Sequence, residues 1–184
     1  TPKVLEEIST KLDLKKPIVF QKSFKRENIK IYSEEISDKY ERIFNILTYA
    51  KESGIIYVRT RRDAELLTEY LHRNKINNVD FFHAGLSTKE KNIRQQKWNS
   101  SNNFTLISTN AFGMGIDKDN VRFVIHFSPS QSIENYYQEI GRAGSDSKKS
   151  YAFMLWDKQE LHNFDQIIKN QTPNKNEFLK ILSY

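Results

Sequence analysis

The feature that most constrains the fold is an alternation of short apolar runs with amphipathic segments from Thr48 onward. It begins with apolar runs at residues 54–58 and 79–82, each followed by an amphipathic segment, at 63–73 and 88–98. Such alternation is typical of βαβ units around a parallel sheet whose strands are buried on both faces. The same rhythm continues in three further apolar runs and one helical segment: 104–107, 123–127, 132–140 and 151–156. We therefore predict an α/β fold built on a parallel sheet.

The remaining segments divide the chain into three parts. Residues 1–35 contain a predicted helix over 2–12 and a predicted strand over 28–34, which we interpret as a linker helix and a lead-in strand. Residues 36–157 form the predicted central domain. Residues 158–184 contain two predicted trailing helices, over 158–169 and 174–183, and Thr172 and Pro173 supply a cap and a first-turn proline for the second.

Composition limits the setting in which the chain works. Its 184 residues, 38% of them hydrophobic, suffice for one compact domain, and a net charge of +6 suits contact with phosphates. Because there is no cysteine, neither disulfides nor thiolate zinc sites exist within these residues. No apolar run approaches the ~20 residues of a membrane helix. We expect a soluble, cytoplasmic monomer with no membrane partner.

Two glycine-containing segments carry the strongest chemical signal. Ser108-Thr-Asn-Ala-Phe-Gly-Met-Gly-Ile-Asp117 follows a predicted strand, and its glycines permit close backbone approach to a ligand, although a tight turn explains an isolated Gly-Met-Gly equally well. Tyr136-Tyr-Gln-Glu-Ile-Gly-Arg-Ala-Gly144 places Gln138 and Arg142 four residues apart, hence on one helical face if the helix extends as far as Arg142. A projecting guanidinium neutralises γ-phosphate charge in phosphoryl transfer, so Arg142 is a candidate.

Two further segments lie at predicted strand ends, where open α/β sheets bind ligands. Phe82-His-Ala-Gly-Leu86 precedes a helix, and its backbone amides together with Ser87 offer donors to a phosphate. His83 by itself is typical of a packing or surface residue, and no metal-ligating constellation is present. Val58-Arg-Thr-Arg-Arg62 places basic residues where they can follow a DNA backbone.

In this order the segments resemble the C-terminal helicase half of superfamily 2, and specifically the RecQ family. Residues 54–62 resemble motif IV, 108–117 motif V and 137–144 motif VI, and the resemblance runs from about Thr1 to Trp156. It implies a RecA-like parallel sheet flanked by helices on both faces. In the family this domain closes over ATP and Mg²⁺, held mainly by a first RecA-like domain of the same chain, and binds single-stranded DNA during unwinding of duplex DNA.

The resemblance also implies roles for individual residues. It places Arg142 and Gln138 at the γ-phosphate as catalytic residues and assigns a further set to nucleotide binding: Gly113, Gly115 and Asp117. Its DNA-binding set comprises the motif IV residues, the loop after the next strand and the start of motif V: Arg59, Thr60, Arg61, His83, Gly85, Thr109 and Asn110.

The sequence also departs from the family pattern. No Gly-x-x-x-x-Gly-Lys-[Ser/Thr] loop and no Asp-Glu-x-His box occurs, so these residues alone are expected to be inactive. The family writes Gly-Arg-x-Gly-Arg-Asp-Gly in motif VI, whereas Ser145 and Ser147 stand here in place of the second arginine and the last glycine. The four-cysteine zinc module of many RecQ proteins does not occur before Tyr184.

Three alternatives compete with the RecQ interpretation. A DEAD-box or chromatin-remodelling half has the same general fold, but motif V and the Tyr-Tyr-Gln-Glu lead into motif VI favour RecQ and hence DNA. A module that binds nucleic acid or protein without an ATP cycle is consistent with Ser145. A Rossmann-type cofactor enzyme is disfavoured because the Gly-x-Gly comes late and lacks the spaced third glycine.

Overall fold

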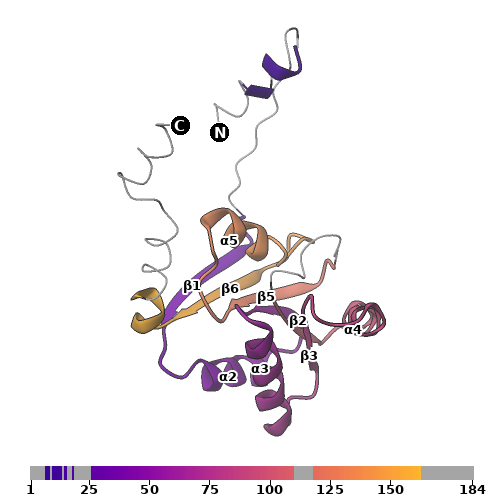
Figure 1. Ribbon diagram of the computed structural model, residues 1–184, viewed down its shortest axis with the longest axis vertical. Coiled ribbons are helices and arrows are strands. Elements are labelled where there is room, and N and C mark those ends of the chain that lie inside the picture. Colours follow the sequence, from indigo (N-terminus) through magenta and orange to yellow (C-terminus); the bar gives the residue numbers. More distant parts are fainter. Residues whose placement is uncertain are drawn as a thin grey trace, which may run out of the picture.

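The described strands form one parallel sheet with six strands (Figure 1). The computed structural model describes residues 7–8, 10–13, 15, 18, 26–109 and 118–162. Strand order is β1-β6-β5-β2-β4-β3, and every hydrogen-bonded pair is parallel. The strands are β1 (Ile29–Glu35), β2 (Ser53–Tyr57), β3 (Val79–Phe82), β4 (Thr105–Ser108), β5 (Val121–His126) and β6 (Ser150–Trp156). The predicted parallel α/β fold is confirmed.

Helices cover both faces of this sheet. They are α2 (Lys39–Tyr49), α3 (Arg61–Arg73), α4 (Thr88–Ser100) and α5 (Ile133–Ile140). Successive residues of a strand point to opposite faces, so Ile55 and Tyr57 share an apolar cluster with residues of α4 and α5. Ile56 and Val58 share the other cluster with residues of α2 and α3. Figure 1 shows α5 on one side of the sheet and α2 and α3 on the opposite side.

Side chains at the helix starts explain where the helices begin. Thr60 caps α3 and Ser87 caps α4, and in both cases the residue three positions later, Asp63 or Glu90, completes a capping box. Ser132 caps α5 by accepting a hydrogen bond from the backbone amide of Asn135. These caps satisfy amide groups that would otherwise lack partners in the first turn.

Sequence reasoning missed one helix. Residues 36–48 received no predicted element, although Asp38 caps α2 and Ile43 and Leu47 bury one face of it. The Ile43 to Leu47 spacing was the available signal. Most of the predicted N-terminal and trailing helices lies outside the described residues, except that residues 158–162 are helical. Within the described residues, no helix has the length and apolarity needed to cross a bilayer.

The first strand belongs to the sheet. β1 pairs with β6 along its whole length, from Ile29 opposite Ser150 to Glu35 opposite Trp156. The sequence analysis had assigned this strand to a lead-in segment that ends at residue 35. The structure shows that this segment supplies one edge of the central sheet.

The connections after β2 and β5 leave the sheet in opposite directions. The chain continues from β2 through α3 to β3, which is one edge of the sheet, and from β5 through α5 to β6 on the other side. Because β2 and β5 are neighbours, their carboxyl ends form a topological switch point. Ligands of open α/β sheets bind in the crevice at such a point.

Close packing between β2 and β5 depends on the absence of a side chain at Gly54. A Cβ atom there would lie 2.0 Å from the Phe123 ring, whereas one at Gly85 would meet only the flexible end of Arg61, at 2.9 Å. We expect Gly54→Ala to lower the free energy of unfolding by about 1–3 kcal/mol through overpacking. Gly85→Ala is the matched control and should cost less. Urea unfolding measures both, and equal losses would contradict the packing argument.

Candidate functional site

A pocket lies at the switch point, beyond the carboxyl ends of β2, β4 and β5. Its volume is about 230 Å³, and we call it the edge pocket. Arg59 and Thr109, both predicted to bind DNA, line it together with side chains from the segment after β5. The other lining residues are Tyr57, Val58, His126, Ser128, Pro129, Ser130, Gln131 and Glu139. The pocket therefore brings together three separate parts of the sequence: residues 57–59, Thr109 and residues 126–139.

A group of buried polar side chains forms the inner wall of the edge pocket. Oε2 of Glu139 lies 2.8 Å from Nε2 of His126 and accepts a hydrogen bond from Oγ of Ser130 at 2.6 Å. The Tyr57 ring stacks on the His126 ring with centroids 5.4 Å apart. His126 is 1% exposed and Glu139 9% exposed. Tyr57, His126, Ser130 and Glu139 are called the buried cluster below.

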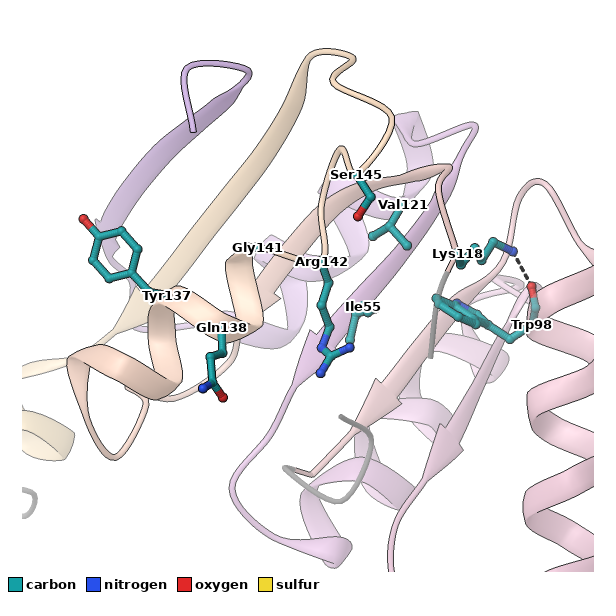
Figure 2. Close-up of a pocket in the computed structure, with 9 residues that line it drawn as sticks. All are labelled: Ile55, Trp98, Lys118, Val121, Tyr137, Gln138, Gly141, Arg142 and Ser145. Carbon is teal, nitrogen blue, oxygen red and sulfur yellow. Dashed lines mark hydrogen bonds between the residues drawn. The ribbon is translucent and has the colours of Figure 1, made fainter. Parts of the chain in front are cut away.

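A second pocket, of about 350 Å³, lies on the α4 and α5 face of the sheet. Gln138 and Arg142 both line it, and we call it the arginine pocket. The helix α5 ends at Ile140, so Arg142 reaches this pocket from the turn after the helix and not from a helical face. In Figure 2 both side chains extend from the α5 region in the same general direction, and the Arg142 guanidinium lies beside Ile55 of β2. Tyr137 points away from Arg142 (Figure 2).

The turn that carries Arg142 is fixed by hydrogen bonds to residues just before β1 and at the start of β5. The Arg26 guanidinium donates to the carbonyl of Gly144 at 2.8 Å, and the Asn28 amide donates to the same oxygen at 2.9 Å. The Gly144 amide donates to the Val121 carbonyl at 2.9 Å. Gly144 has φ +62°, and a Cβ there would lie 2.4 Å from the Asn28 side chain. This position therefore requires glycine.

The same turn shows why the family pattern has glycine at the position of Ser147. Ser147 has φ 63°, in the left-handed region where glycine is favoured, and the family writes glycine at this position. Nearby, the Arg122 guanidinium hydrogen-bonds to Asp146 at 2.5 Å and lowers the pKa of that carboxyl. Ser145, at the position of the missing second arginine, lines the arginine pocket.

Tyr57 lies between the two pockets. Burial raises the pKa of Tyr57 to about 12, while the charge of Arg142 and a side-chain hydrogen bond with it act in the opposite direction. Tyr57 therefore touches the Arg142 guanidinium with its hydroxyl and His126 with its ring. Arg142 and the buried cluster are in direct contact.

Lys118 completes the arginine pocket on the α4 side. Its Nζ hydrogen-bonds to the backbone carbonyls of Trp98 and Ser101 and lies 4.7 Å from the centroid of the Trp98 ring (Figure 2). Burial lowers the pKa of Lys118. A cation at the end of α4 neutralises the carbonyl groups there and holds the chain entering β5 against this helix.

Three further predicted DNA-binding residues, Arg61, His83 and Gly85, lie together at a second place on the same edge. A Cβ on Gly85 would lie 2.9 Å from the Arg61 guanidinium and 3.3 Å from Nδ1 of His83, so these three residues are neighbours. His83 is buried, with Nε2 3.0 Å from a Glu65 carboxylate oxygen. Thr60 is already engaged, because its hydroxyl donates to the Asp63 carboxylate at 2.7 Å.

The start of α4 differs from the expected phosphate site. Both the amide and the hydroxyl of Ser87 donate to the Glu90 carboxylate, at 2.9 and 2.6 Å. These hydrogen bonds lower the pKa of Glu90. A carboxylate of the chain itself thus uses the Ser87 donors that the sequence analysis assigned to a phosphate.

Some predicted site residues lie outside the described residues: Asn110, Gly113, Gly115 and Asp117. Conversely, sequence reasoning missed the buried cluster and Lys118. Glu139 stands one residue after the predicted Gln138, but only the fold shows that it faces His126. Among the described residues, no group of three or more His, Cys, Asp or Glu is arranged to hold a metal ion.

Comparison with known protein families identifies the family to which the chain belongs. The helicase conserved C-terminal domain family matches residues 38–147, which is more than half of the 184 residues. The chain therefore belongs to this family of helicase C-terminal domains. Within the family it is of the RecQ type, as the following relatives show, and the predicted resemblance to RecQ is confirmed.

Three curated relatives illustrate the RecQ relationship. The ATP-dependent DNA helicase RecQ of Pasteurella multocida is 37% identical over 173 residues, which is 92% of this chain and 27% of the relative. The RecQ helicase of Bacillus subtilis is 34% identical over 88% of this chain and 27% of the relative. Helicase Q1 of Pongo abelii is 33% identical over 100% of this chain and 29% of the relative. The chain thus spans less than a third of these relatives.

Solved structures show the same fold. Saccharomyces cerevisiae Dbp5 bound to RNA and ADP BeF3 matches with a TM-score of 0.70 at 20% identity, over 91% of this chain and 46% of that one. The second DEAD-box helicase domain of Mss116p, bound to an RNA duplex, matches with a TM-score of 0.60 at 18% identity, over 84% of this chain and 68% of that one. The RecA-like fold with helices on both faces is confirmed.

The raised pKa of Tyr57 predicts an alkaline loss of stability. The phenol ionises near pH 10 in the unfolded chain but only near 12 in the folded protein. The stabilisation is complete below pH 10 and decreases as the pH rises towards 12. Between these values, the parent should lose about 1.4 kcal/mol more per pH unit than Tyr57→Phe. Urea unfolding from pH 9 to 11.5 measures the difference, and parallel curves for the two proteins would contradict it.

Proposed function

We propose that this chain is the second motor domain of a RecQ-type ATP-dependent DNA helicase. One observation carries the proposal: Arg142 and Gln138 line one pocket, and the turn that carries Arg142 is held at Gly144 by Arg26, Asn28 and Val121. A preorganised guanidinium is what stabilisation of transferring phosphate charge requires. The names of the curated relatives, which are ATP-dependent DNA helicases, support the same activity for the complete protein.

The chain contributes one side of the ATP site. The residues present suit the outer phosphate of ATP, because Arg142 and Gln138 offer donors, while the sequence contains neither a phosphate-binding loop nor the Asp-Glu-x-His box. We assign ATP and Mg²⁺ binding mainly to a first RecA-like domain of the complete protein, and Mg²⁺ supplies charge neutralisation there. Gln138 orients the phosphate and Arg142 neutralises its developing charge when the two domains close.

The carboxyl edge of the sheet contributes the DNA side. Arg59 and Thr109 line the edge pocket, and Arg61 and Gly85 adjoin each other nearby. Donors from the ends of three neighbouring strands suit successive phosphates of single-stranded DNA. We propose that this edge holds the DNA backbone while the opposing domain opens and closes, and that the protein works as a cytoplasmic monomer.

Ser145 favours one alternative function. A motor that has lost its second motif VI arginine and hydrolyses ATP negligibly would serve as a nucleic-acid or protein binding module on the same fold. The two functions predict different effects of Ser145→Arg on the rate of ATP hydrolysis.

Arg142→Ala tests the proposed function in the complete helicase. An arginine finger contributes ~10³ to 10⁵ in rate, so this variant should nearly abolish ATP hydrolysis while ATP binding is largely retained. Ser145→Arg should change the rate much less, and residues 1–184 alone should hydrolyse no ATP above a buffer control. The readouts are steady-state hydrolysis and nucleotide affinity.

Arg73→Ala is the matched control, because this exposed arginine lies at the far end of α3 from the carboxyl edge. Activity of Arg142→Ala within about a few-fold of the parent would refute the finger assignment. A negligible parental rate that Ser145→Arg raises by orders of magnitude would establish the binding-module alternative.

Binding of single-stranded DNA should be weak and sensitive to salt. Each phosphate contact contributes about 0.7 to the slope of log affinity against log salt concentration for a single strand. Arg59→Ala and Arg61→Ala should each reduce the slope by about that amount, whereas Arg73→Ala should leave it unchanged. Fluorescence anisotropy of a labelled oligonucleotide over several salt concentrations measures the slope. An affinity independent of salt would rule out the electrostatic account.

A further inference from the structure

The buried cluster joins the two pockets to which the proposed function assigns DNA and ATP. Tyr57, Ser130 and Glu139 line the edge pocket, and Arg142 lines the arginine pocket. Each contact along this line is direct: Ser130 to Glu139, Glu139 to His126, His126 to Tyr57, and Tyr57 to Arg142. Side chains thus connect the two sites through the interior of the domain.

The backbone at both ends of this line is held in place by other contacts. After β5, the Phe127 carbonyl accepts a hydrogen bond from buried Lys39 at 2.8 Å, and the Ser128 hydroxyl donates to Glu160 at 3.3 Å. At the other end, Arg26 and Asn28 hold the turn that carries Arg142. Because both backbone segments are fixed, a change in the edge pocket reaches Arg142 through the side chains of the buried cluster.

The Ser130 hydroxyl has one proton to donate and two candidate acceptors. In this structure it donates to the Glu139 carboxylate, which is 9% exposed. A phosphate in the edge pocket competes for the same proton, and Arg59 and Thr109 are the neighbouring residues suited to hold that phosphate. A buried carboxylate that loses a donor must gain another, because an unsatisfied buried charge is costly.

Glu139 is linked to Arg142 in two ways, through the Tyr57 hydroxyl and through the backbone. Glu139 acts electrostatically on Tyr57, the same hydroxyl that Arg142 contacts. Glu139 and Arg142 are also three residues apart along the chain, and the Arg142 amide bonds to the Glu139 carbonyl at 3.3 Å. A rearrangement of hydrogen bonds around Glu139 therefore changes the contacts that hold the Arg142 guanidinium.

We propose that the buried cluster couples DNA binding in the edge pocket to the position of Arg142, with Ser130, Glu139 and Tyr57 as positioning residues. The proposal rests on the proposed function and deepens it, because it explains how a DNA phosphate at the carboxyl edge of the sheet would regulate hydrolysis at the arginine pocket. The element with two arrangements is the Ser130 hydroxyl, which bonds to Glu139 without DNA and to a backbone phosphate with DNA.

The test uses the complete helicase and an oligothymidine single strand. Turnover number and KM for ATP are measured with and without DNA for the parent, Tyr57→Phe and Ser130→Ala. Tyr57→Phe retains the ring stacked on His126 and removes only the hydroxyl. Tyr49→Phe, an exposed tyrosine on α2, is the matched control. Melting midpoints and DNA affinities of all variants are measured in parallel.

The proposal predicts a particular split between the kinetic constants. One hydrogen bond corresponds to a factor of about three to ten in rate, so Tyr57→Phe should reduce the DNA-stimulated turnover number by about that factor. Ser130→Ala removes the Ser130 donor from Glu139 with or without DNA, as a bound phosphate would, so it should instead raise the turnover number measured without DNA. The ratio of rates with and without DNA should fall in both variants, while KM for ATP in both, and the DNA affinity of Tyr57→Phe, stay within about two-fold of the parent. Tyr49→Phe should behave as the parent.

The other possible outcomes would overturn either the coupling role alone or the proposed function together with it. A parent that shows DNA-stimulated hydrolysis, with both cluster variants stimulated to within about two-fold of it, overturns the coupling role alone. Rates that fall equally with and without DNA, together with a lower melting midpoint, assign the cluster to structure and also overturn it. A parent without any DNA-stimulated hydrolysis overturns the proposed function and this inference with it.

Discussion

The parallel pairing of β2 with β5 is the constraint on which the rest of the structure depends. Gly54 allows the Phe123 ring to lie against β2, and Ile55 and Ile56 are fully buried on opposite faces of the sheet. Because the chain leaves these two neighbouring strands in opposite directions, their carboxyl ends form the crevice occupied by the edge pocket. The site is thus a consequence of strand order.

Buried charge gives the site its rigidity. Lys39 and Glu139 are both nearly inaccessible to solvent, and each is paired: Lys39 with the Phe127 carbonyl and Glu160, Glu139 with His126 and Ser130. Pairs of this kind contribute little net stability compared with apolar packing. Their contribution here is positional, since they tie the segment after β5 to three other segments of the chain.

The catalytic arginine of the proposed site depends on residues far away in the sequence. Arg26 and Asn28 precede the sheet, yet they hold the turn that follows α5, more than a hundred residues later. The pairing of β1 with β6 brings them there. This edge strand, which the sequence analysis placed in a lead-in segment, thereby helps to position Arg142, so the turn and the first strand form one structural unit.

The sequence by itself determined the parallel α/β fold and most strands to within two residues, because these follow from local periodicity. It also singled out Gln138 and Arg142, which both line the arginine pocket. It also determined the RecQ relationship through its motifs. Only the tertiary structure decided that Tyr57, Ser130, His126 and Glu139 share one buried cluster. Strand order, which local pattern does not encode, brings segments from two distant strands together, and burial then forces their polar groups to pair.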